Sequence, residues 1–186
     1  WEGTETGLHS YRLTVFDNLP RTGLPPQFVS YSEYQRSIQT IIDTEIIEDA
    51  TKIWWDIRPH PRFPTLEFRF ADICTKVDEV ICLASLVLAI VAKLIRLRRT
   101  NQSWRSYRHP LIIENKWRAV RWGLDGKLID LGIEEKVPTR DLIRELLDRV
   151  APLASQLNVT DELAHIHTIL DRGANADQQL RIWREN

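Results

Sequence analysis

Residues 55–69 read WDIRPHPRFPTLEFR, and this stretch decides the fold because two alternating segments flank a Pro-His-Pro turn. Apolar and polar side chains alternate through residues 52–58, and the alternation returns through residues 65–70. A period of two is typical of β-strands, so the sequence predicts an antiparallel hairpin with one apolar face. The opposite face of the hairpin is charged and carries Asp56, Arg58, Glu67 and Arg69.

The charged face of this hairpin has two interpretations. Glu67 and Arg69 are two residues apart, so their side chains lie side by side on the strand. A carboxylate on a stiff strand can hold Mg²⁺, and an arginine beside it can bind phosphate through two N–H groups. Cross-strand ion pairs on a solvated sheet would use the same residue types. The spacing alone therefore does not decide whether the charged face is the floor of an active site or part of a structural scaffold.

Histidines and basic residues elsewhere give weaker signals. His60, between two prolines, could transfer protons or contact phosphate, or it could be a structural part of the turn. His165 and His167 are two residues apart, so on a helix they point to different sides and make a poor metal pair. Lys116 and Arg118 lie near Arg121 in one predicted helix, and Arg118 and Arg121 share a face at i, i+3 that forms either an anion-binding edge or simply a basic helix face.

The composition is that of an ordinary water-soluble domain, or of part of a larger one. The 186 residues are 43% hydrophobic and 27% charged, with a formal net charge of −1. This balance gives no reason to expect nucleic acid or an anionic membrane as the main partner. Two cysteines, Cys74 and Cys82, are too few for a disulfide framework, so we expect buried thiols in a reducing cytoplasm. Because the chain begins at Trp1 and contains no methionine, we expect it to be part of a longer polypeptide.

The remaining pattern is mostly helical. The apolar run at residues 80–92 is shorter than the roughly 20 residues that span a bilayer, so it predicts a central core helix, buried on all sides, that ends near Thr100. Caps, prolines and glycines bound further helices, and a short strand should follow the turn at Asp125-Gly126. The predicted fold class is α+β. The other predicted helices cover approximately residues 8–19, 30–43, 110–122, 137–157, 160–172 and 175–186.

Several longer blocks resemble one protein family. They are WWDIRPHPRFPTLEFRFADICTKVDEV at 54–80, TGLHSYR at 6–12 with PRTGLPP at 20–26, and ENKWRAVRWGLDGKLID at 114–130. VPTRDLIRELL and HTILDRGANADQQL fit the same family towards the C-terminus. The chain resembles the carboxylate–amine ligases of glutamate–cysteine ligase family 2 over nearly its whole length. Residues 1–186 resemble the C-terminal portion of a single catalytic domain, without its N-terminal half.

This resemblance implies a glutamine-synthetase-like catalytic fold, in which a curved antiparallel sheet carries ATP, Mg²⁺ and substrate on its polar face. A Glu-x-Arg strand of that superfamily supplies a metal ligand and a phosphate-binding arginine, and it matches Glu67 and Arg69. The Arg58-Pro59-His60 segment should lie beside it across the hairpin. The resemblance thus implies that Arg58, Glu67 and Arg69 are catalytic. It also implies that Arg58, His60 and Arg69 contact ATP, and that Glu67 binds the metal.

The chemistry that the resemblance implies is ATP-dependent amide formation through an acyl phosphate. The expected substrates are a glutamate-like carboxylate and a cysteine-like amine, and the expected assembly is a homo-oligomer without nucleic acid or membrane. No covalent nucleophile is needed, which agrees with the absence of GxSxG from the sequence. The alternative function is a non-catalytic packing or oligomerisation unit.

Overall fold

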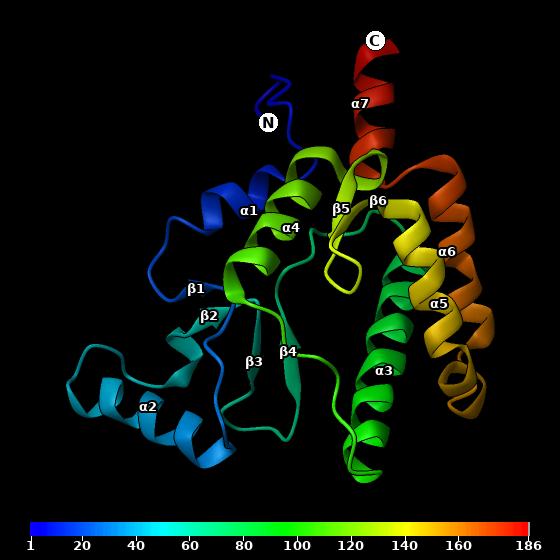
Figure 1. The fold of residues 1–186 in the computed structure, drawn as a ribbon. Coiled ribbons are helices and arrows are strands. Elements are labelled where there is room, and N and C mark those ends of the chain that lie inside the picture. The colour runs from blue at the N-terminus through cyan, green and yellow to red at the C-terminus, as the bar shows by residue number, and fades with distance from the viewer. Residues whose placement is uncertain (186) are drawn as a thin grey trace. The chain divides into compact units, whose positions relative to one another are not determined.

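The structure is a computed structural model that describes residues 1–185, and it confirms the α+β class (Figure 1). The chain forms two compact units, one of residues 11–72 and one of residues 1–10 with the chain from Ile73 onward. The helices are α1 (Tyr11–Phe16), α2 (Tyr31–Asp43), α3 (Val77–Arg99), α4 (His109–Trp122), α5 (Thr139–Gln156), α6 (Thr160–Arg172) and α7 (Asn175–Glu185).

The described strands are short and form three two-stranded sheets rather than one. β1 pairs with β2 in parallel, whereas β3 with β4 and β5 with β6 are antiparallel pairs. The strands are β1 (Thr22–Gly23), β2 (Trp54–Trp55), β3 (Ile57–Pro59), β4 (Leu66–Phe68), β5 (Lys127–Asp130) and β6 (Glu135–Pro138), and two 3-10 turns, η1 (Ala50–Lys52) and η2 (Gly123–Asp125), precede β2 and β5.

In the unit of residues 11–72, α2 begins where the sequence predicts. The Ser30 hydroxyl accepts a hydrogen bond from the Glu33 backbone N–H at 3.1 Å, and the Glu33 carboxylate accepts one from Val29 N–H at 2.6 Å. This reciprocal cap satisfies one N–H group of the first helical turn and one just before the helix. The helix packs on a small apolar core whose buried members are Tyr34, Ile38, Ile47 and Ile53.

The predicted hairpin is present, but it is shorter than the alternation indicates. β3 and β4 are antiparallel, with Arg58 opposite Glu67 and Ile57 opposite Phe68. The prediction of one continuous strand through residues 52–58 is wrong, because residues 54–55 form β2. That strand pairs with Thr22–Gly23, which lies between the predicted helices at residues 8–19 and 30–43.

Burial of the hairpin is the reverse of what its apolar and charged faces would indicate. Asp56 and Arg58 are 2% and 5% exposed, whereas Leu66 and Phe70 are 49% and 41% exposed. A buried charge is costly unless it is paired and hydrogen-bonded. Asp56 and Arg58 therefore belong to the interior of this unit and need internal partners, whereas Glu67 and Arg69 on the same side are partly exposed.

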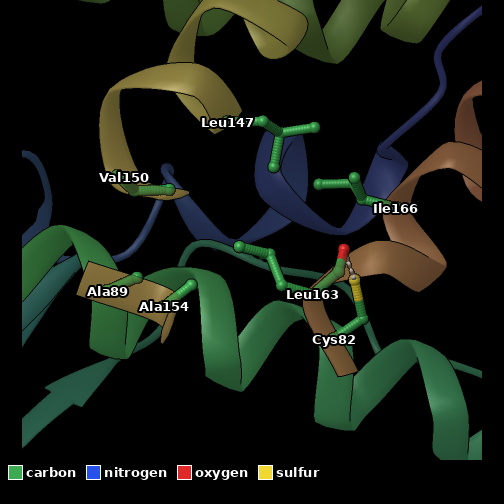
Figure 2. Close-up of a cluster of buried hydrophobic side chains, with 7 residues drawn as sticks. All are labelled: Cys82, Ala89, Leu147, Val150, Ala154, Leu163 and Ile166. Atoms are coloured by element: carbon green, nitrogen blue, oxygen red, sulfur yellow. Dashed lines mark hydrogen bonds between the residues drawn. The ribbon is translucent and has the colours of Figure 1, made fainter. Parts of the chain in front are cut away.

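In the other unit, α3 packs against α5 and α6 around one apolar cluster (Figure 2). The Cys82 thiol lies 3.7 Å from the carbonyl oxygen of Leu163, which ties α3 to α6. These contacts place α3 at the centre of a three-helix layer. The buried members of the cluster are Cys82, Ala89, Leu147, Val150, Ala154, Leu163 and Ile166.

The prediction that α3 is buried on all sides is wrong. Its buried face carries small residues at Cys82, Ser85 and Ala89, whereas larger apolar side chains on another face of the helix are exposed. α3 is long and apolar enough to cross a membrane, and within residues 1–185 it is the one helix that meets these criteria of length and composition. Core helices of soluble proteins meet the same criteria. We call the exposed apolar residues Val77, Ile81, Leu88 and Ile95 the outer apolar stripe of α3. Its successive members are four or seven residues apart, so they share one helix face.

A second hairpin follows α4 and was only half predicted. The Asn115 side chain both donates to the carbonyl oxygen of Ile129 at 2.8 Å and accepts from its N–H at 2.7 Å, which fixes β5 against α4. β6 was missed, so α5 begins at Thr139 rather than at residue 137. Pro152 lies inside α5, which continues through it, and Thr160 is the first residue of α6 rather than its cap.

The two faces of α3 give a direct stability test. Ala89 is fully buried, whereas Leu88, the residue before it, is 46% exposed. An aspartate introduced at either position has the same helix propensity, so the two variants differ mainly in whether the new charge is buried. We expect Ala89→Asp to lower the free energy of unfolding by about 3 kcal/mol or more, because it buries an unpaired charge. We expect Leu88→Asp to cost less than about 1 kcal/mol. Urea unfolding of both variants measures the difference, and equal losses would show that the outer stripe is covered as well.

Candidate functional site

Glu67 lies at the centre of the charged hairpin, between two arginines. Arg58 Nε donates to Glu67 Oε2 at 2.8 Å, and Arg58 Nη2 lies 2.7 Å from the same oxygen. Arg69 Nη1 donates to the other oxygen, Oε1. Both pairs form because Glu67 on β4 faces Arg58 across the hairpin and precedes by two residues Arg69, which directly follows β4. The structure therefore brings together the three residues that the sequence analysis predicted to be catalytic.

Arg58 uses most of its donors within its own unit. Besides the contact with Glu67, its Nη1 donates to the carbonyl oxygens of Ala50 and Thr51 at 3.1 and 2.7 Å and to that of Ile53. These carbonyls belong to η1 and to the residue that follows it, at the entrance to β2. Arg58 thus connects this turn to Glu67. This geometry favours a positioning role, and the contact with ATP that the resemblance implies stays a prediction.

Arg69 differs from Arg58 because it keeps donors available. Its side-chain Nε is buried and has no hydrogen-bond partner within residues 1–185. Its backbone is fixed on both sides, since its N–H donates to Asp56 O at 2.8 Å and its carbonyl oxygen accepts from Arg12 Nη1 at 3.1 Å. An arginine with a fixed backbone and an unused donor is suited to bind an anion.

Arg12 is a residue of this cluster that the sequence analysis missed. Its guanidinium carbon lies 5.1 Å from the ring centre of Phe16, and that of Arg69 lies 5.8 Å from the same ring. Both cations are therefore within cation–π distance of one aromatic face. Arg12 belongs to the TGLHSYR block, so the sequence did contain a signal for it, although not one of spacing.

His60 lies at the hairpin turn and has a structural role there. Its Nδ1 accepts hydrogen bonds from the backbone N–H groups of Arg62 and Phe63, at 3.1 and 3.2 Å. Its ring also packs against that of Phe63, with 4.8 Å between ring centres. Only Nε2 is left for a ligand, so the contact with ATP that the resemblance implies stays a prediction.

The charge of Glu67 is stabilised by its neighbours. Burial raises the pKa of its carboxyl group, but hydrogen bonds from Arg58 and Arg69, with the charges of both, outweigh this and hold the pKa below the ordinary 4.5. Glu67 is consequently ionised at neutral pH, as a metal ligand must be. Within residues 1–185, no group of three or more His, Cys, Asp or Glu side chains is arranged to hold a metal.

The other sequence candidates named above belong to the unit that contains residues 73–185. Cys82 is buried, which raises the pKa of its thiol, whereas Cys74 is only half-buried, so the expectation that both are buried holds for one of them. Arg118 donates to the carbonyl oxygen of Lys127, and Arg121 donates to that of Gly7. This basic helix face therefore serves, at least in part, to hold neighbouring backbone.

The sequence profile described as glutamate–cysteine ligase family 2 matches residues 1–186. The chain belongs to this family. Among curated members of glutamate–cysteine ligase family 2, the protein of Rhodospirillum rubrum is 52% identical over 185 residues, which are 100% of this chain and 48% of that protein. Those of Solibacter usitatus and Chloroflexus aggregans are 49% and 47% identical, with 100% of this chain covering 48% and 47% of theirs. All three are named, provisionally, glutamate–cysteine ligase 2, and the chain spans about half of their length.

The paired arginines give Glu67 a testable effect on stability. Its lowered pKa means that the stabilisation is present above the ordinary carboxyl pKa and is lost as the pH falls through the folded-state value. We expect Glu67→Gln to cost about 2 kcal/mol or more at pH 7, because buried Arg58 loses its counter-charge. The difference from the unchanged protein should shrink in acid, as followed by urea unfolding at several pH values.

Glu145→Gln is the matched control, because Glu145 pairs with Arg149 on an exposed part of α5. It should change stability by less than about 1 kcal/mol at every pH. A loss in Glu67→Gln that stays constant as the pH falls would contradict the stabilising ion pairs.

Proposed function

We propose that the chain is a catalytic part of an ATP- and Mg²⁺-dependent carboxylate–amine ligase of the glutamate–cysteine ligase type. The observation that supports this best is the partly buried Arg58–Glu67–Arg69 cluster with its unused Arg69 donor. Membership of the family supports the reaction class. The proposal includes a glutamine-synthetase-like catalytic fold. This chain would form one part of that fold, and the half of the relatives that it does not span would form the rest.

The chemical task is to make a poor electrophile reactive. A carboxylate does not accept an amine at neutral pH. In the proposed reaction a carboxylate oxygen attacks the terminal phosphorus of ATP, ADP leaves, and an acyl phosphate forms. The amine nitrogen then attacks the acyl carbon, phosphate leaves with the C–O electron pair, and the nitrogen loses a proton. Enzymes of this kind act mainly by positioning and by neutralising charge, so arginines and a carboxylate suffice without a covalent nucleophile.

Each member of the cluster has a proposed role. Arg69 would hold phosphate oxygens, because its Nε is without a partner and a guanidinium can bind two oxygens at once. Glu67 would be a Mg²⁺ ligand, which fits a metal usually held by one or two carboxylates with phosphate oxygens and water. Arg58 would mainly position Glu67, and His60 would reach ATP through Nε2.

The wider proposal includes the partners and the cellular location. The substrates would be a glutamate-like carboxylate and a cysteine-like amine, and the enzyme would be a cytoplasmic homo-oligomer. No role with nucleic acid or membrane is proposed, which the net charge of −1 supports. The exposed outer stripe of α3 favours a second candidate function, a packing or oligomerisation unit, because large apolar surfaces mark interaction sites.

Substitution of the two arginines by lysine distinguishes a catalytic role of the cluster from a purely structural one. Lysine keeps the positive charge but loses the planar fork that binds two oxygens. We expect Arg69→Lys to lower ATP-dependent phosphate release at least tenfold, or by about 1.4 kcal/mol, with little change in melting temperature. We expect Arg58→Lys to act first on stability, with a cost of about 2 kcal/mol, because lysine cannot satisfy Glu67 and three carbonyls together.

The measurement is phosphate release per folded molecule in the presence of ATP, Mg²⁺, glutamate and cysteine, together with thermal unfolding. Arg144→Gln, at an exposed pair with Asp141 on α5, serves as the control and should change neither quantity. Full activity per folded molecule in Arg69→Lys would assign the cluster to the scaffold.

A further inference from the structure

A polar pocket lies in the unit that contains α4, α6 and α7. It has a volume of about 400 Å³, and its walls come from the N-terminal segment, η2 and α7. Three of the blocks that carry the family resemblance meet here, namely TGLHSYR, ENKWRAVRWGLDGKLID and HTILDRGANADQQL. The side chains that line the pocket are His9, Asp125, Asp177, Leu180, Arg181, Arg184 and Glu185.

Two glycines make room for the side chains of this pocket. Gly123 caps α4 with φ +52°, and Gly173 caps α6 with φ +92°, a backbone conformation in which side chains cause strain. A β-carbon at Gly123 would lie 2.4 Å from His9 Nδ1, and one at Gly173 would lie 2.8 Å from the Asp177 β-carbon. The chain therefore brings both helix ends close to His9 and Asp177, which only glycine permits.

His9 and Asp177 form the most enclosed part of the pocket. His9 Nδ1 lies 3.4 Å from Asp177 Oδ1, and the two side chains are about one-fifth exposed. Both residues are also held by backbone hydrogen bonds, from His9 N–H to Val120 O at 2.8 Å and from Ala174 N–H to Asp177 Oδ2 at 2.8 Å. The Asp177 carboxylate is thus fixed in position at the start of α7.

Charges of both signs surround this carboxylate. Arg181 Nη2 donates to the carbonyl oxygen of Arg172 at 3.3 Å, which holds its guanidinium near the end of α6. Arg184 pairs with Glu5 at 2.6 and 3.2 Å, and Asp125 pairs with Arg140 at 2.8 Å. A small pocket with fixed carboxylates and guanidinium groups matches a ligand that carries both an ammonium and a carboxylate group.

We propose that this pocket binds the α-ammonium and α-carboxylate groups of an amino-acid substrate. Asp177 accepts hydrogen bonds from the ammonium group, and Arg181, supported by Arg184, binds the carboxylate. The inference rests on the proposed ligase function, because that function supplies amino acids as the substrate class. It assigns to His9 and Gly123 the role of shaping the pocket.

The test is equilibrium binding of glutamate and of cysteine to the purified protein without ATP, measured by titration calorimetry. We expect one of the two amino acids to bind with a dissociation constant of about 1 mM or below. Analogues that lack the amino group or the α-carboxylate should bind at least tenfold more weakly. Asp177→Asn keeps the acceptor for Ala174 N–H but removes the charge, and it should weaken binding at least tenfold, as should Arg181→Gln.

Arg144→Gln on the outer side of α5 removes the same charge as Arg181→Gln and should leave binding unchanged. Absence of binding to the unchanged protein, or equal binding by Asp177→Asn, would overturn the pocket assignment. Amino-acid binding without any ATP-dependent phosphate release would instead overturn the ligase function and keep the pocket. If phosphate release persists in Asp177→Asn with unchanged KM for both amino acids, the pocket assignment fails and the ligase function stands.

Discussion

One carboxylate shared by two guanidinium groups organises the unit of residues 11–72. Two arginines so close together repel each other, and the repulsion is stronger where water is partly excluded, as it is around buried Arg58 and half-buried Arg69. Glu67 supplies the negative charge that allows both Arg58 and Arg69 to stay inside. Arg58 in turn holds the carbonyls of η1, and the backbone of Arg69 joins Asp56 to Arg12. The local fold and the candidate site therefore depend on the same charge.

The two arginines have different proposed roles because they differ in how many N–H donors remain without a hydrogen-bond partner. Arg58 satisfies Glu67 and three carbonyls, so its energetic contribution lies mainly in the folded chain itself. Arg69 has a similar charge but a buried Nε without a partner within residues 1–185. An unsatisfied buried donor costs free energy in the absence of a ligand. Such a cost is recovered on binding, which is a common property of functional sites.

Sequence patterns predicted which residues share a face more reliably than which face is buried. Period-two alternation indicated the hairpin and placed Arg58 and Glu67 on the same face, because a strand's side chains must alternate, and the structure adds that the two residues are directly opposite. It could not show that the charged face is the interior one, since burial depends on the segments that pack there. The parallel pairing of Thr22–Gly23 with Trp54–Trp55 joins distant segments of two residues each, for which no local pattern exists.

The same limit explains the error over α3. Apolar residues occur on nearly every face of α3, and this pattern predicts a helix that is buried on all faces. In the structure, however, α3 packs closely against α5 and α6 through the small side chains of Cys82, Ser85 and Ala89. The spacing of these small residues, at i, i+3 and i+7, was the signal that could have identified the inner face. Metal and nucleotide ligands at Glu67 and Arg69 were proposed from resemblance, because spacing alone did not distinguish them from a scaffold.

The close approach of Gly123 to His9 has a consequence for how family sequences vary. Because a β-carbon at position 123 would overlap the imidazole ring of His9, Gly123 cannot be replaced while His9 keeps its place. A relative with any side chain at 123 must carry a smaller residue at 9, or a differently placed N-terminal segment. A side chain at position 123 would therefore have to be accompanied by a smaller residue at position 9 and would still bear the backbone strain of φ +52°, so we expect glycine to be kept at position 123.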